Sequence, residues 1–143
     1  MSRALEERIT DTQASNHRMI AVNHRVGVGL GLTSVAALHI LDLPGNFAET
    51  PYRAALYIAL IIASFVLTQQ LVIAGTRRDF FAAAALSAAV IVGFTINRTV
   101  GMPGAANDIG NWLERLGLLS IAVVAFVPWQ SIAAVVGMPR KAR

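Results

Sequence analysis

The stretch that decides the fold runs from Phe80 to Val136 and reads FFAAAALSAAVIVGFTINRTVGMPGAANDIGNWLERLGLLSIAVVAFVPWQSIAAVV. Two apolar runs, each about twenty residues long, flank a polar loop rich in glycine, and this length suits a helix that crosses a bilayer. The stretch therefore predicts two antiparallel membrane helices joined by a loop. The rest of the chain follows the same plan.

Composition supports the membrane class. Of the 143 residues, 55% are hydrophobic and only 14% are charged, whereas a soluble domain carries about a quarter of charged residues. The absence of cysteine excludes disulfides and thiolate metal sites. No Ser-His-Asp or Cys-His set and no paired carboxylates stand at a diagnostic spacing, so we expect a non-catalytic protein.

We predict an all-α membrane protein, a single domain forming a four-transmembrane-helix bundle. The spans are expected at residues 26–41, 53–75, 80–98 and 117–136, with outer loops at 42–52 and 99–116. The first loop is predicted from Pro44, Gly45 and Pro51, which are typical of turns. Residues 1–25 are polar and predict either a short surface helix or a frayed terminus.

The distribution of basic residues predicts the topology. Of the 12 Lys and Arg residues, only Arg53, Arg98 and Arg115 lie beside the two predicted outer loops. The others lie in the N-terminal segment, in the turn at 76–79 and in the C-terminal tail. Basic residues favour the cytoplasmic side, so we expect both termini in the cytoplasm of a multi-pass protein of the cell (inner) membrane. This placement also explains the positive charge without nucleic-acid binding.

Polar side chains gather at the predicted outer face. They are His39, Asp42, Glu49, Arg98, Asp108 and Glu114. Because an unpaired ionisable group at this depth is costly, we expect a connected cluster of His39, Asp42, Arg98 and Asp108. His39 and Asp42 could instead begin a divalent metal site that a further carboxylate completes. Arg98 could bind an anionic head group or a quinone oxygen.

Further polar residues lie within the predicted spans. Gln69, Gln70 and Gln130 stand in the inner halves and either hydrogen-bond between helices or line a polar permeation path. His24 and His39 raise the question of haem, but the last three spans contain no histidine. A haem would therefore need a ligand from another subunit, and no cofactor is favoured.

Small residues recur at four-residue spacing in the spans. Gly27 and Gly31 form such a pair, and the third span holds Ala85, Ala89 and Gly93. Such stripes allow close approach of helices, so we expect tight packing at both places.

Two loop motifs suggest a family. Thr99-Val100-Gly101-Met102-Pro103-Gly104 precedes Asp108-Ile109-Gly110-Asn111-Trp112, and Leu116-Gly117-Leu118 opens the last span. The chain thereby resembles small bacterial four-span membrane proteins that share this loop, over residues 39–121. The resemblance implies the architecture and draws attention to the outer loops, but no activity comes with it.

Three functions remain open from the sequence. The first is an accessory subunit or a homo-oligomer, in contact with other membrane subunits or copies of itself, whose outward loops bind a partner or a small ligand. The second is a small oligomeric transporter or channel. The third is a haem- or quinone-binding membrane anchor using His39 and Arg98.

Overall fold

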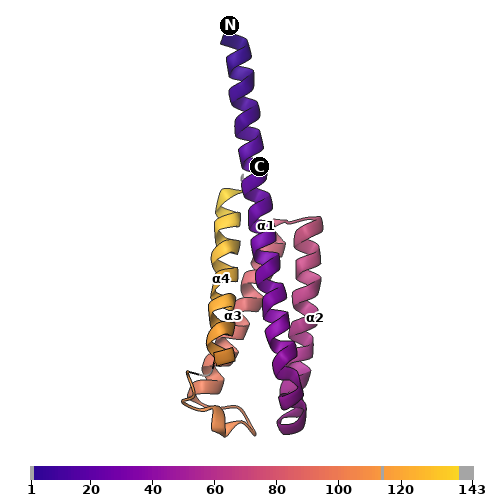
Figure 1. Cartoon of the computed structure of the whole chain (residues 1–143), viewed down its shortest axis with the longest axis vertical. Helices are drawn as coiled ribbons and strands as arrows, with labels where there is room; N and C mark the ends of the chain where they lie inside the picture. The colour runs from indigo at the N-terminus through magenta and orange to yellow at the C-terminus, as the bar shows by residue number, and fades with distance from the viewer. Residues whose placement is uncertain (1, 114, 139–143) are drawn as a thin grey trace.

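A computed structural model describes residues 2–113 and 115–138, and these residues form helices and loops without a strand. The elements are α1 (Ser2–Glu49), α2 (Pro51–Ile73), α3 (Arg77–Thr99), the short 3-10 turn η1 (Ala106–Asp108) and α4 (Arg115–Gly137). The long helices run alternately up and down as a bundle (Figure 1). Four helices are long and apolar enough to cross a membrane.

The first helix differs from the prediction. The loop expected at residues 42–52 is instead helical up to Glu49, and α1 also extends back through the predicted N-terminal segment. Pro44 removes one backbone N–H donor from α1, and helices in lipid tolerate this loss. Gly45 does not adopt the positive φ of a turn. The break falls at Thr50, with φ −143° and ψ 80°, because a residue before proline avoids the helical region. Pro51 then begins α2, where its fixed φ suits a first helical position.

A tight turn joins α2 to α3. Gly75 has a φ of +55°, which ends α2 in the left-handed conformation that glycine adopts readily. The side chain of Asp79 accepts a 2.7 Å hydrogen bond from the backbone N–H of Thr76, in a capping box that starts α3. We call the end of the bundle that holds Gly75 the terminal end. The opposite end, with Thr50 and residues 100–113, is the loop end.

The apolar core lies toward the terminal end. Its buried members are Val28, Leu32, Leu71, Phe80, Ala83, Val127 and Ala134. α1 packs mainly against α2 and α4, and α3 packs mainly against α4. At Gly31 an added Cβ would lie 2.6 Å from Cγ2 of Val127, so α1 and α4 approach closely here.

Candidate functional site

The loop half of the bundle holds a partly open cavity of about 730 Å³. Its walls are apolar and come mostly from facing sides of α2 and α3: Leu56, Ala59, Leu60, Ala63, Leu86, Ala89, Val90 and Gly93. Leu86 also packs against the core, so the core closes the cavity toward the terminal end. The polar lining residues come from the outermost turns of α1, α2 and α3, from the loop and, through Ser120, from α4.

Asp108 is the centre of the polar part. Its Oδ2 accepts 2.9 Å hydrogen bonds from Nη1 of Arg53 on α2 and from Nδ2 of Asn97 on α3. Its Oδ1 lies 3.4 Å from Nη1 of Arg98, whose side chain is only 4% exposed. A buried guanidinium is costly unless it is paired. Asp108 therefore compensates the charge of Arg98 and ties the loop to two helices.

The pKa of Asp108 reflects this environment. Burial of the carboxylate raises its pKa, but the hydrogen bond from Asn97 and the charges of Arg53 and Arg98 outweigh that effect. The net result is a pKa below the ordinary value of an aspartate. Asp108 is therefore ionised at neutral pH.

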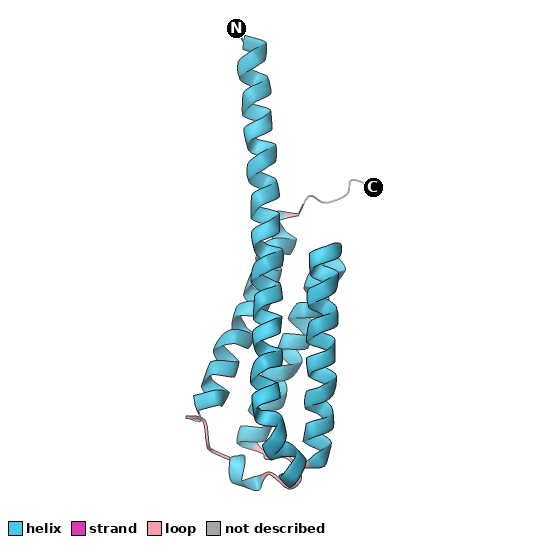
Figure 2. Ribbon diagram, turned by 45° about the vertical axis from the view of Figure 1, so that its right-hand side comes forward, coloured by secondary structure: helices cyan, strands magenta, loops and turns pink. Residues whose placement is uncertain are grey.

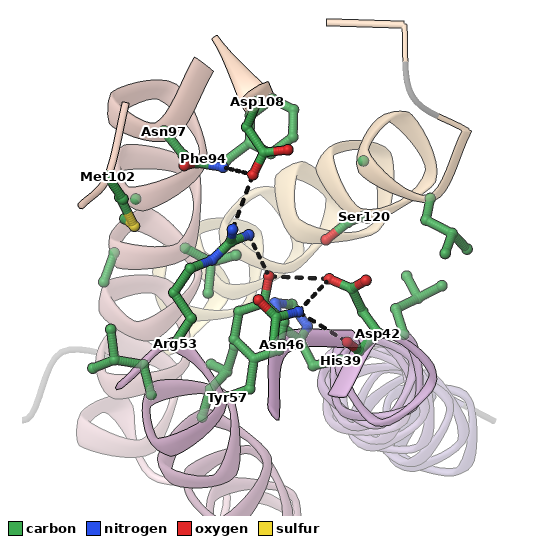
Figure 3. A pocket seen from close by; sticks show the side chains of 18 of the residues that line it. His39, Asp42, Asn46, Arg53, Tyr57, Phe94, Asn97, Met102, Asp108 and Ser120 are labelled. Carbon is green, nitrogen blue, oxygen red and sulfur yellow. Dashed lines mark hydrogen bonds and ion pairs between the residues drawn. The ribbon is translucent and has the colours of Figure 1, made fainter. Parts of the chain in front are cut away.

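The bonds continue across the cavity to α1. Nη2 of Arg53 makes a long 3.5 Å contact with Oη of Tyr57, which donates a 3.1 Å hydrogen bond to Oδ2 of Asp42. Nδ2 of Asn46 donates to the same carboxylate at 3.2 Å. Figure 3 shows this chain running from Asp108 to Asn46. We call it the polar network, made of Asn97, Arg98, Asp108, Arg53, Tyr57, Asp42 and Asn46.

His39 lies beside the network without a hydrogen bond to Asp42. Its Nδ1 donates to the backbone carbonyl of Val35 at 2.8 Å. Its ring meets that of Tyr57 edge to face, with 4.7 Å between the ring centroids. The donated proton fixes one ring nitrogen, so a neutral His39 keeps its Nε2 as an acceptor.

His39, Asp42, Arg98 and Asp108, the residues of the predicted cluster, all line one cavity. They are not all in direct contact with one another. Arg98 pairs with Asp108 directly, whereas Asp42 joins them only through Tyr57 and Arg53. Glu49 lines the cavity, and Glu114 falls outside the described residues. Within residues 2–113 and 115–138, no three His, Asp or Glu side chains converge as a metal site would require.

In the described part of the chain, no hydrogen bond joins Gln69 or Gln70 to Gln130, the residues predicted either to bond between helices or to line a polar path. Gln69 and Gln70 are exposed on α2. Oε1 of Gln130 instead accepts a 2.8 Å hydrogen bond from Nδ1 of His24. The structure therefore gives Gln130 a local partner on α1.

Sequence reasoning missed Arg53, Tyr57 and Asn46 as site residues. From the sequence, Arg53 counts only among the basic residues beside the outer loops. A signal was present, because Arg53 and Tyr57 are four residues apart and so share one helix face. Asp42 and Asn46 have the same spacing, but it carries meaning only if the helix continues past Pro44.

Comparisons of the chain with protein-family models, with curated proteins and with solved structures find no match. A functional assignment therefore depends on the geometry of the cavity and of the polar network.

Proposed function

We propose that this chain is a non-catalytic integral membrane protein that binds a small amphipathic ligand in the cavity at its loop end. The cavity carries the proposal. Its volume of about 730 Å³ falls in the range of small-molecule sites, about 300–1,000 Å³, which are mostly apolar with a few placed polar groups. The apolar body of the ligand would lie between α2 and α3, and its head would face the polar network.

The network favours a head group that donates hydrogen bonds. Asp42 accepts only from the neutral donors Asn46 and Tyr57, and it makes no ion pair within the described chain. Asn97 is 7% exposed, and no described residue donates to its Oδ1. Asp108 is already engaged by two arginines. The Asp42 carboxylate and Oδ1 of Asn97 can therefore accept further hydrogen bonds, which suits an alcohol or amine head.

The orientation and assembly belong to the same proposal. The basic residues of α1 and of the turn at 76–79 favour the cytoplasm, so the loop end with its cavity would lie on the outer side of the cell membrane. The protein would act there as an accessory subunit or as a homo-oligomer. A quinone, whose oxygens accept hydrogen bonds, is the alternative ligand, and its partners would be Arg53 and Arg98.

Native mass spectrometry of the purified protein tests the proposal. We expect a bound molecule of defined mass on the wild type. Gly93→Leu should remove it, because this side chain enters the cavity, where an added Cβ meets nothing within 4 Å. Val92→Leu is the matched control, since Val92 is exposed on the same helix.

Two outcomes would contradict the proposal. One is a wild type that carries only a heterogeneous set of bulk lipids. The other is a bound molecule that Gly93→Leu and Val92→Leu retain equally. The mass itself separates an alcohol or amine from a quinone, because the compound is identified by fragmentation.

A further inference from the structure

The N-terminal part of α1 extends well beyond the bundle (Figures 1 and 2). Side chains 5–16 and 18–23 are all exposed. Most of the stability of a helix in a protein comes from packing one of its faces against other elements. A partner along this segment would supply that packing.

One row of residues on α1 has the spacing of a coiled-coil seam. Steps of alternately four and three residues connect Leu5, Ile9, Thr12, Asn16, Met19, Asn23 and Val26. No charged residue falls on this row, although the same segment holds Arg3, Glu6, Glu7, Arg8, Asp11, Arg18 and Arg25. Such a charge-free row at a period of 3.5 residues is the pattern by which two helices pack along each other.

The same row continues along the bundle on the outer side of α1. Its next members are Leu30, Thr33, Ala37 and Ile40, all exposed, with Leu30 at 64%. The opposite side of α1 is buried and carries Val28, Leu32, Val35, Ala36 and His39. From Leu5 to Ile40 the row is about 52 Å long at about 1.5 Å per residue. It therefore exceeds the three to four heptads that favour a coiled coil.

We propose that a second copy of this chain binds along this row, so that the two α1 helices form a parallel coiled coil. Two copies in one membrane with the same orientation have parallel α1 helices, and a two-fold axis then brings each row residue to its own copy. Asn16 and Asn23 are one heptad apart and occupy the same seam position as Ile9. Asparagine at this position pairs with its copy through the side-chain amides and specifies a parallel dimer. Arg8 would face Gln13 of the partner subunit, so this register places no like charges across the seam.

Cysteine crosslinking of the full-length protein in isolated membranes tests this dimer, because the natural chain contains no cysteine. Under mild oxidation, Asn16→Cys should form a disulfide dimer at least several-fold more efficiently than Ala14→Cys. Ala14 is exposed but stands on the side of α1 away from the row. A scan of residues 8–20 should peak at Ile9, Thr12, Asn16 and Met19. Equal crosslinking of both variants, or a scan without this period, would overturn the proposal.

A second measurement does not depend on disulfide chemistry. Asn16→Asp would place two carboxylates against each other in the seam, so the dimer fraction measured by single-molecule photobleaching in vesicles should fall at least tenfold. Ala14→Asp adds the same charge away from the row and should leave the fraction unchanged. A crosslinked product between Asn16→Cys and a different protein would assign the row to another subunit and reject the second copy.

Discussion

Gly31 and Gly93 are expected to respond in opposite directions to substitution by leucine. A Cβ at Gly31 would lie 2.6 Å from Cγ2 of Val127 and 3.6 Å from Cδ1 of Phe126. At Gly93 nothing lies within 4 Å of the same added atom. Gly31→Leu must therefore push α1 away from α4, whereas Gly93→Leu places its side chain in the cavity.

The size of each effect follows from two terms. Overpacking a closely packed contact costs about 1–3 kcal/mol and occasionally more. Replacing a glycine inside a helix returns about 0.8 kcal/mol. For Gly31→Leu we expect a net loss of about 2 kcal/mol, because leucine adds several carbon atoms to this contact. Gly93→Leu creates no overpacked contact, so only the gain in helix propensity remains. Stability should therefore be unchanged or higher by about 1 kcal/mol.

Thermal melting in a single detergent measures both. At this chain length, 1 kcal/mol corresponds to about 2–4 °C in Tm. Gly31→Leu should therefore melt about 4–8 °C lower, and Gly93→Leu at or slightly above the wild type, with Val92→Leu as the control on α3. An equal fall for Gly31→Leu and Gly93→Leu would show that α3 packs closely where the structure has a cavity. Unchanged melting of Gly31→Leu would refute the contact between α1 and α4.

Three further predictions concern the loop end. Asp108→Asn should lower stability by about 2 kcal/mol, because it removes a carboxylate that pairs with both Arg53 and the buried Arg98, and a loss no larger than that of the exposed Asp11→Asn would contradict this role. The melting difference between wild type and Asp108→Asn should shrink at low pH. A carboxylate whose folded pKa is depressed contributes fully above its unfolded pKa of about 4 and loses that contribution as pH falls through the folded value. A gap that does not narrow at all below pH ~4, or that closes already near pH ~6, would show that Asp108 is not the titrating group. Asn107→Cys should react with an impermeant maleimide from outside intact cells and Arg78→Cys should not, since basic residues favour the cytoplasm, and the reverse labelling would invert the proposed topology.

The three later helices were predictable from sequence almost to their ends. Spans expected at 53–75, 80–98 and 117–136 correspond to Pro51–Ile73, Arg77–Thr99 and Arg115–Gly137. Long apolar runs leave few alternatives, since only a helix satisfies its own backbone in lipid. The first helix was different because Pro44 and Gly45 carry a turn signal that the long α1 helix overrides.

The packing of small residues could not be predicted from spacing alone. Gly31 meets α4 closely, as its stripe suggested, but Ala89 and Gly93 line the cavity instead of a helix contact. A small side chain permits either close approach or empty space. The outcome depends on what the facing helix presents, and the sequence of one helix does not contain that information.

We expect the polar network to contribute to stability and the cavity wall to ligand binding. Variants of the two can therefore test the proposed function separately. The ion pair of Asp108 with Arg98 is expected to stabilise the fold, because Arg98 is 4% exposed and carries a charge. Gly93 faces open space, so its substitution should leave these ion pairs intact. If a ligand occupies the cavity, Gly93→Leu should abolish binding in a protein that melts normally. A network that served only to hold the helices together would predict no binding change from that variant.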